Sequence, residues 1–314
     1  MKKHYKIAFC GMGSIGRRHF KNTIKYLSEH DCSFQIDVIR SGKGKKLEDV
    51  FENYISEYYS DMDVIPEDYD IIFITNPTSM HWNSIRQYQN CTQSMFIEKP
   101  VTDSVETGAE ELRRDLVCYV ACPLRYTKVL QYLKRNIDVG RVYSVRAVCS
   151  TYLPGWHPQE DYRESYSARK DMGGGVAIDL IHEWDYLVWL FGRPAHVSSV
   201  RRKVSELEID SEDIAVYLGY TENRIYELHL DYFGRCEARE MEIYLPGRTV
   251  RADIRNGVIR FSDQETAVSL QEERNEYQMR EIAHFFDIVN GICENDNDIA
   301  EAVKTLRLAM GFEN

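Results

Sequence analysis

The sequence predicts an α/β protein in which an N-terminal doubly wound parallel sheet is followed by an α+β domain with a mostly antiparallel sheet. Three observations predict this architecture. In the first third of the chain, short apolar runs alternate with segments of helical length, as in parallel sheets covered on both faces. A glycine-rich turn separates the first apolar run from a helical pattern. From Arg141 onward, longer alternating strands joined by turn-like connections replace that rhythm.

The elements of the parallel sheet are predicted from their apolar runs. A strand is expected over Tyr5–Cys10, a helix from about Gly16 to His30, and a second strand over Phe34–Ile39. Three more short buried strands are expected over Tyr69–Thr75, Ser94–Ile97 and Leu116–Ala121, each separated from the next by a segment of helical length.

The second part of the chain predicts a different sheet. Its expected strands are Val142–Tyr152, Val197–Lys203, Asp213–Gly219, Arg224–Tyr232, Glu240–Leu245 and Val258–Phe261. Two helices are expected to follow, near Asn275–Val289 and Ile299–Met310. Because 314 residues suit about two domains, we expect a first domain over residues 1–122 and a second over residues 123–314.

Composition narrows the class of protein. A net charge of −11 argues against nucleic acid or an anionic membrane as the main partner. No apolar stretch reaches the roughly 18 residues of a membrane helix, and glycines interrupt the run after Lys2 and Lys3, which argues against a secretory signal. We therefore expect a cytoplasmic protein. The eight cysteines form no CxxC pair and no metal-type spacing with histidine, so we expect free buried thiols and no metal site.

The glycine-rich turn carries the first functional hypothesis. Gly11 permits a tight turn out of the strand, Gly13 lets the backbone approach a pyrophosphate, and Gly16 lets helix and strand pack closely. With Ser14 and Ile15, these glycines would offer phosphates the free N–H groups of a helix N-terminus. The pattern predicts a dinucleotide site, and a structural glycine turn is the alternative.

Four motifs together carry a family resemblance. They are Gly11–Gly16, the segment TNPTSMH from Thr75 to His81, Glu98-Lys99-Pro100, and the segment GGGVAIDLIHEWD from Gly173 to Asp185. In this order they resemble the glucose-fructose oxidoreductase and inositol dehydrogenase family (Gfo/Idh/MocA) over nearly the whole chain. The resemblance implies an N-terminal Rossmann domain, a C-terminal domain with an open sheet that often mediates oligomerisation, and NAD(P)-dependent oxidation or reduction of a sugar or polyol carbon. A homodimer or homotetramer follows from this resemblance alone.

Lys99 and His182 are the candidate catalytic pair. Hydride transfer from a carbinol carbon requires a base for the hydroxyl proton and a charge that stabilises the oxygen. Lys99 follows a predicted strand at the sheet edge where ligands of such sheets bind, and its ammonium could orient the reacting oxygen. A solvated lysine in a turn is the alternative.

His182 is assigned the proton transfer, with Asp179 orienting the substrate or the imidazole. If Val176–Phe191 is one helix, Asp179, His182 and Asp185 fall along one face, and the carboxylates could fix the tautomer of the imidazole. Alternatively, Asp179 belongs to a helix cap and His182 is a core histidine. Many relatives place the histidine four residues after the aspartate, whereas here the gap is three.

Cofactor choice depends on the end of the second strand. Asp37 has about the right distance from Gly16 to bind ribose hydroxyls, but the predicted strand places it in the strand interior. Arg40, Ser41 and Lys43 would then hold a 2′-phosphate, which favours NADP over NAD. A solvated basic turn is the alternative.

The remaining candidate residues lie in two groups. By similarity, Thr75, Asn76, Pro77, His81 and Glu98 would bind the cofactor, although a turn and helix start also explain Pro77. For the substrate, the candidates are Arg125, Arg163, Tyr166 and Arg169, whose cations suggest an anionic group. Pairing of these arginines with nearby carboxylates at the surface is the alternative.

Three functions remain at this point. The first is an NAD(P)-dependent dehydrogenase or reductase acting on a sugar or sugar acid, in acidic or cell-surface carbohydrate metabolism. The second is a glycoside hydrolase or lyase of the same fold that oxidises its sugar transiently and regains its cofactor. The third is a non-catalytic dinucleotide sensor, because fold alone does not imply catalysis.

Overall fold

The computed structural model describes residues 2–42 and 47–312, which form two compact units. The first unit contains the chain up to Ala121 together with Gln278–Val303, and the second contains Cys122–Tyr277 and the residues from Lys304 on. The expected division between residues 122 and 123 stays a prediction. The first unit also takes in residues 278–303, which lie far beyond that boundary.

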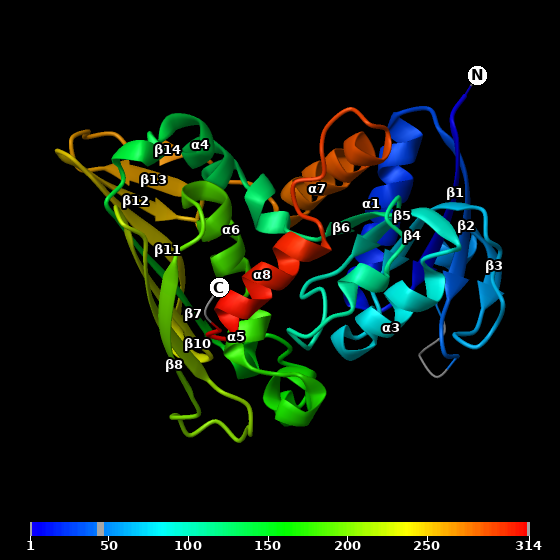
Figure 1. Ribbon diagram of the computed structural model, residues 1–314, viewed down its shortest axis with the longest axis horizontal. Helices are drawn as coiled ribbons and strands as arrows, with labels where there is room; N and C mark the ends of the chain where they lie inside the picture. The colour runs from blue at the N-terminus through cyan, green and yellow to red at the C-terminus, as the bar shows by residue number, and fades with distance from the viewer. Residues whose placement is uncertain (1, 43–46, 313–314) are drawn as a thin grey trace. The chain divides into compact units, whose positions relative to one another are not determined.

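The first unit is built on a six-stranded parallel sheet (Figure 1). Its strands are β1 (His4–Cys10), β2 (Ser33–Ile39), β3 (Ile55–Tyr59), β4 (Tyr69–Ile74), β5 (Thr92–Ile97) and β6 (Val117–Val120), in the order β3-β2-β1-β4-β5-β6. All neighbouring pairs run parallel, so the expected sheet is confirmed. Strand β3 was not predicted, because this edge strand is only partly buried and lacks an apolar run.

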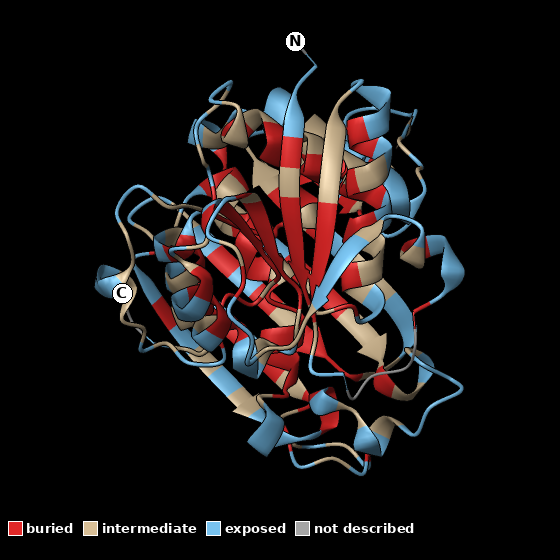
Figure 2. Ribbon diagram, turned by 90° about the vertical axis from the view of Figure 1, so that its right-hand side faces the viewer, coloured by how far each residue is buried: buried red, intermediate tan, exposed pale blue. Residues whose placement is uncertain are grey.

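The core of this sheet explains why its central strands read as continuous apolar runs. Figure 2 shows the middle strands buried over most of their length. Phe9 and Phe73 stack on neighbouring strands with ring centroids 4.4 Å apart. Helix α7 (Arg274–Val289) adds Phe285, whose ring meets that of Phe96 edge-on at 5.2 Å. A segment near the end of the sequence therefore completes the core of the first unit.

The helices of the first unit differ from the expected alternation. They are α1 (Ser14–Glu29), α2 (Asp49–Glu52) and α3 (Thr78–Tyr88), with a short 3-10 turn η1 (Ala109–Glu111). Between β5 and β6, where a segment of helical length was expected, the described chain forms only η1. Pro100 and Gly108 disfavour a helix in this connection, and few of its apolar side chains are buried.

The second unit is built on an eight-stranded sheet. Its strands are β7 (Ser144–Tyr152), β8 (His196–Arg202), β9 (Ile214–Tyr220), β10 (Ile225–Asp231), β11 (Phe233–Leu245), β12 (Arg248–Asp253), β13 (Val258–Phe261) and β14 (Val268–Ser269). They lie in the order β14-β13-β12-β11-β7-β10-β9-β8. The pair β7–β10 is parallel and the others are antiparallel, which confirms the mostly antiparallel sheet.

Two features of this sheet escaped the sequence reading. The short strands β12 and β14 were not expected. Strand β11 begins seven residues before the expected start, since its first half has a register shift between Phe233 and Ala238 and exposed side chains that break the alternation.

The helices of the second unit are short. They are α4 (Lys128–Asn136), α5 (Val176–Asp179) and α6 (His182–Phe191), and α8 (Ile299–Ala309) enters this unit at Lys304. The 3-10 turns are η2 (Pro123–Tyr126), η3 (Val139–Arg141), η4 (Leu153–Gly155), η5 (Tyr162–Glu164), η6 (Tyr166–Ala168) and η7 (Lys170–Met172). The condition that residues 176–191 form one helix is not met, because α5 ends at Asp179 and α6 begins at His182. None of the helices described is both long and apolar enough to cross a lipid bilayer.

Candidate cofactor and catalytic site

The three glycines of the motif, two in the turn after β1 and one in the first turn of α1, have three different surroundings. Gly11 has a φ of +97°, and a Cβ added there would lie 2.5 Å from the backbone nitrogen of Asn76. A Cβ on Gly16 would lie 2.5 Å from the carbonyl oxygen of Gly11. A Cβ on Gly13 would meet no atom within 4 Å. Packing therefore requires Gly11 and Gly16, whereas Gly13 borders open space.

That open space lies at the start of α1. Gly13 is the N-cap residue and has no side chain to accept a bond from the first turn. The first N–H groups of a helix have no acceptor within the helix, and they carry a partial positive charge. Ser14 and Ile15 present such groups beside the space that a Cβ on Gly13 would fill. A pyrophosphate fits these donors and this cradle.

Three loops meet at the carboxyl edge of the parallel sheet. The Thr75 amide donates to the carbonyl of Cys10 at 2.9 Å, and its hydroxyl donates to the carbonyl of Gly11 at 2.7 Å. The ring nitrogens of buried His81 each lie 2.9 Å from a carbonyl oxygen, one of Asn76 and one of Pro100. His81 thus links the loops after β4 and β5. Burial lowers the pKa of His81, so the neutral ring has one N–H and donates to one of these two carbonyls, and we assign His81 to loop positioning.

Pro77 and Asn76 complete the loop after β4. Pro77 immediately precedes α3, and its carbonyl accepts from the amide of Met80 at 2.8 Å, as expected for a helix start. The Asn76 side-chain amide donates to the hydroxyl of Ser84 at 2.8 Å. Both residues therefore shape the edge of the site, and their contact with a cofactor stays a prediction.

A buried ion pair supports the Glu-Lys-Pro motif. The Glu98 carboxylate lies 2.6 Å from Nε2 of His19 on α1, and it accepts the backbone N–H of Lys99 at 3.0 Å. Burial alone would raise the pKa of Glu98, but the bond to His19 and the charges of His19 and Lys99 lower it below its ordinary value. Glu98 therefore stays ionised and fixes the backbone of Lys99.

His19 was missed by the sequence reading. It lies on the buried face of α1 with Gly16 and Thr23, one turn away in each direction. A histidine on the apolar face of a predicted helix indicates a buried polar contact, so His19 could have been a candidate. Its partner Glu98 lies 79 residues later and cannot be identified from the helical pattern.

The end of β2 holds the residues predicted to select the cofactor. Asp37 is fully buried within β2 and accepts a bond from the Tyr69 hydroxyl at 2.7 Å. Arg40 and Ser41 follow the last residue of the strand, and the Arg40 amide donates to the carbonyl of Tyr59 at 2.9 Å. Lys43 lies outside the described residues. The cationic side chain of Arg40 thus follows the end of β2, while the Asp37 carboxylate is buried in the protein.

Asp179 and His182 belong to the second unit. Asp179 is the buried last residue of α5, and the hydroxyl of Tyr232 donates to its carboxylate. Burial, followed by the charge of Asp179, raises the pKa of Tyr232 far above its ordinary value, so this hydroxyl keeps its proton and donates. His182 is the first residue of α6 and is partly exposed. Tyr232 was missed, because 53 residues separate it from Asp179.

Glu212 is another carboxyl beside this motif that sequence reasoning missed. A Cβ on Gly175, whose φ is +141°, would lie 2.5 Å from the Glu212 carboxyl group. Burial raises the pKa of Glu212, and the charge of Asp179 adds to this effect. The glycine run therefore leaves room for a second carboxyl close to Asp179.

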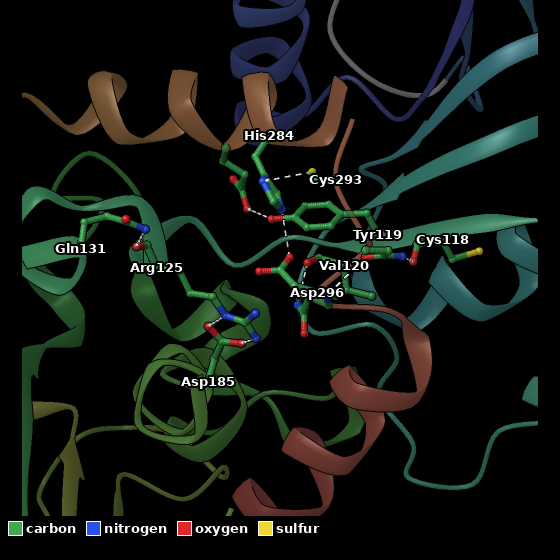
Figure 3. A network of polar contacts seen from close by, with 12 residues as sticks. Cys118, Tyr119, Val120, Arg125, Gln131, Asp185, His284, Cys293 and Asp296 are labelled. Atoms are coloured by element: carbon green, nitrogen blue, oxygen red, sulfur yellow. Dashed lines mark hydrogen bonds and ion pairs between the residues drawn. The ribbon is translucent and has the colours of Figure 1, made fainter. Parts of the chain in front are cut away.

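Asp185, which was expected to lie on one helix face with His182, is paired with Arg125. Asp185 accepts two bonds from buried Arg125, one from Nη2 at 2.6 Å and one from Nε at 3.0 Å (Figure 3). This bidentate pair fixes the loop before α4 to α6.

The other predicted substrate residues lie at the surface. Arg163 bonds Asp161 and Glu208, and Arg169 bonds Asp171, so surface pairing describes both arginines. Tyr166 is 46% exposed. Binding of substrate by these three residues and by Arg125 stays a prediction.

The sequence also predicted free buried thiols and no metal site. Within residues 2–42 and 47–312, no group of three histidine, cysteine, aspartate or glutamate side chains could hold a metal ion. The eight cysteines are free thiols. Four are buried, three are partly exposed, and Cys236 is exposed, so the expected burial holds for only part of the set.

We predict that Gly13→Ala separates cofactor binding from folding. The added methyl group fills the space of the pyrophosphate, so dinucleotide affinity should fall at least about tenfold, or 1.4 kcal/mol, in a fluorescence titration with NADPH and NADH. The free energy of unfolding should change by less than about 1 kcal/mol. Gly16→Ala is the matched control, because its Cβ meets a backbone carbonyl and should destabilise the fold. Unchanged affinity in Gly13→Ala would contradict this site.

We predict a pH dependence of stability from Glu98. Its pKa is lowered in the folded state, so its contribution is complete above its ordinary pKa of 4.5 and is lost as the pH falls through the folded value. Glu98→Gln should cost about 2 kcal/mol at neutral pH, because its amide oxygen can still accept from His19 but the negative charge that faces His19 and the Lys99 N–H is lost. In urea titrations this difference should shrink below pH 4.5. Glu29→Gln, at an exposed position, is the control, and a difference that grew on acidification would refute the assignment.

Comparison with known protein families matches both parts of the chain. Residues 5–114 match the family model described as an oxidoreductase family with an NAD-binding Rossmann fold. Residues 130–247 match the model of the Gfo/Idh/MocA C-terminal domain. Together, these matches cover most of the chain and both of its sheets.

Among curated proteins, the chain is 27% identical to D-xylose dehydrogenase of Paenarthrobacter nicotinovorans over 188 residues, which are 56% of this chain and 48% of that protein. It is also 27% identical to scyllo-inositol 2-dehydrogenase (NAD(+)) of Bacillus subtilis over 208 residues, 64% of this chain and 57% of that protein. The matches thus span about half the length of these relatives.

Among solved structures, levoglucosan dehydrogenase in complex with NADH and levoglucosan has a TM-score of 0.82 at 14% identity, covering 99% of this chain and 96% of that one. The WlbA dehydrogenase of Bordetella pertussis, in complex with NADH and UDP-GlcNAcA, has a TM-score of 0.78 at 16% identity, covering 99% and 95%. At these identities the likeness establishes the fold. With the two family matches, it follows that the chain belongs to the Gfo/Idh/MocA family of oxidoreductases.

Proposed function

We propose that this protein is an NAD(P)-dependent dehydrogenase that acts on a CH–OH group of a sugar or polyol. The main observation behind the proposal is the open space beside Gly13, at the N-terminus of α1. Lys99 follows β5 at the same edge of the sheet, in the loop that His81 links to the loop after β4. The named activities of the curated relatives, on D-xylose and scyllo-inositol, support a sugar or polyol substrate.

The chain's own residues would handle the proton and the oxygen. The bound dinucleotide would supply the hydride acceptor. The His182 imidazole accepts the hydroxyl proton, and the Lys99 ammonium donates a hydrogen bond to the oxygen as its charge develops. Asp179, held by Tyr232, orients the substrate or the imidazole.

We favour a neutral sugar over a sugar acid. The guanidinium of Arg125 is bound by Asp185, and Arg163 and Arg169 are bound by carboxylates of their own neighbourhood. An anionic substrate would have to compete with these pairs. A link to acidic carbohydrate metabolism would require the substrate to displace these carboxylates from the arginines.

A homodimer or homotetramer is part of the proposal. Five apolar side chains that are 39% to 57% exposed project from strands β8, β9 and β10 of the second unit: Val200, Val216, Leu218, Tyr220 and Ile225. Cross-strand register places Val200 beside Val216, and Tyr220 beside Ile225. Such a patch suits contact with a second copy of this chain.

We predict that Lys99→Met and His182→Gln lower kcat by about 10² to 10⁴ while leaving dinucleotide affinity within about twofold. The assay follows reduced nicotinamide by absorbance with xylose, inositols and uronic acids as substrates. Lys25→Met, at an exposed position on α1, is the matched control and should keep full activity.

Two other outcomes would replace the proposal. Conversion of a glycoside without accumulation of reduced cofactor would identify a hydrolase or lyase that oxidises its substrate transiently. If both variants kept the biological activity that Gly13→Ala abolished, the protein would be a dinucleotide sensor.

We further propose a preference for NADP over NAD, and predict that Arg40→Asp reverses it. The guanidinium would pair with the 2′-phosphate, so its replacement should weaken NADPH binding at least about tenfold and spare NADH. Fluorescence titration with both cofactors measures the ratio. Arg86→Ser, on the exposed side of α3, is the control. Equal losses for both cofactors, or tighter NADH binding by the unmodified protein, would overturn the preference.

A further inference from the structure

A cysteine, a histidine and an aspartate meet near the end of α7, within the first unit and outside the residues considered so far (Figure 3). The sulfur of Cys293 lies 3.8 Å from Nδ1 of His284. The other ring nitrogen of His284, Nε2, lies 3.0 Å from a carboxylate oxygen of Asp296. The three side chains therefore form one chain of contacts, with the imidazole in the middle.

The backbone brings these residues together. Gly291 has a φ of +68° just after α7, the Gly291 amide donates to the carbonyl of Ile288, and the Ile292 amide donates to that of Asp287. This is the pattern of a Schellman cap, which reverses the chain at a helix end. Cys293, nine residues after His284, is thereby turned back beside it.

The loop beyond the cap is anchored to β6. The side-chain amide of Asn295 donates to the carbonyl of Cys118 at 2.7 Å, and that of Asn297 donates to the carbonyl of Val120 at 2.7 Å. The Val120 amide donates back to the carbonyl of Asn297 at 2.8 Å. Asp296 lies between these two anchors, so its position beside His284 is set by the sheet.

The contacts determine which ring nitrogen can act as a base. A carboxylate only accepts hydrogen bonds, so Asp296 requires the proton of the neutral His284 ring to sit on Nε2. The lone pair is then on Nδ1, which faces the Cys293 sulfur. The ring of Tyr119 also meets the imidazole edge-on at 6.1 Å, which restricts its rotation.

Cys293 depends on such a base for reactivity. Burial, together with the carboxylates of Asp287 and Asp296, raises the pKa of the Cys293 thiol above its ordinary value. The thiol therefore holds its proton at neutral pH, and the thiolate is the form that reacts. The Cys293 thiol is nevertheless accessible to solvent, because Cys293 is partly exposed and the neighbouring Ile292 is 71% exposed.

Buried thiols of this chain, unlike Cys293, are not accessible to solvent. Burial raises the pKa of Cys10 and of Cys118 to about 12, and both side chains are closed off from solvent. Cys236, by contrast, is exposed on β11. Cys236 therefore tests whether exposure alone makes a thiol react.

We propose that Cys293 is a site of reversible modification by low-molecular-weight disulfides, with His284 as its general base and Asp296 as the residue that positions the imidazole. In the reaction, the thiol proton moves to Nδ1 of His284 as the sulfur attacks one sulfur of the small disulfide. The disulfide bond breaks, and its electron pair leaves on the departing sulfur, which takes the proton from His284. Cys293 is oxidised to a mixed disulfide and the departing half is reduced to a free thiol.

The test measures thiol reaction rates in the native protein with dithiodipyridine as the small disulfide. We expect one thiol to react at least about tenfold faster than the others, and peptide mapping by mass spectrometry to identify it as Cys293. Cys293→Ser should remove this fast phase, and Cys236→Ser should keep it. Dithiothreitol should release the added group.

The role of the base is tested by two further variants. His284→Gln should slow the fast phase by about 100-fold, within the range of general-base contributions. Asp296→Asn should slow it less, because its amide oxygen can still accept the Nε2 proton. Circular dichroism and NADH binding check that each variant is folded. A fast phase that maps to another cysteine, or a folded His284→Gln that reacts as fast as the unmodified protein, would overturn the proposal.

Discussion

The hydroxyl of Thr75 bonded to the carbonyl of Gly11 is the contact on which the architecture of the first unit's site depends. It joins the end of β4 to the turn after β1 at a point where neither Gly11 nor Gly16 has room for a Cβ. These close contacts fix the turn against the start of α1, and Gly13 is left beside open space.

Two buried histidines make further contacts between the segments around this turn. His19 reaches from α1 to Glu98 at the end of β5, and His81 links the loops after β4 and β5. Each contact spans two elements that follow different strands of the sheet. The backbone of Lys99 is therefore held by Glu98, and Glu98 is held by His19 of α1. These contacts connect the helix that follows the glycine turn to the Glu-Lys-Pro motif.

The parallel sheet could be predicted because its strands are buried on both faces and therefore read as apolar runs, as Ile71–Ile74 does. The edge strand β3 and the first half of β11 could not, since partial exposure and a register shift remove the periodic signal. The break between α5 and α6 could not be predicted, because a two-residue interruption at Leu180 and Ile181 does not change the apolar pattern.

The candidate site was predictable where motifs are local. Gly11, Gly13 and Gly16 have the surroundings that their spacing implies. The partners of Glu98, Asp179 and Asp185 were not predictable, because His19, Tyr232 and Arg125 are separated from them by 53 to 79 residues. Such pairings depend on how the sheets close, which a local pattern does not contain.

The placement of α7 has a consequence for how the chain matures. The rings of Phe96 and Phe73 lie on β5 and β4, yet the phenylalanine that covers them, Phe285, is nearly two hundred residues further along. During synthesis from the N-terminus, the parallel sheet emerges from the ribosome long before its cover. Until the residues of α7 have been made, the rings of Phe73 and Phe96 lack the cover that Phe285 gives them.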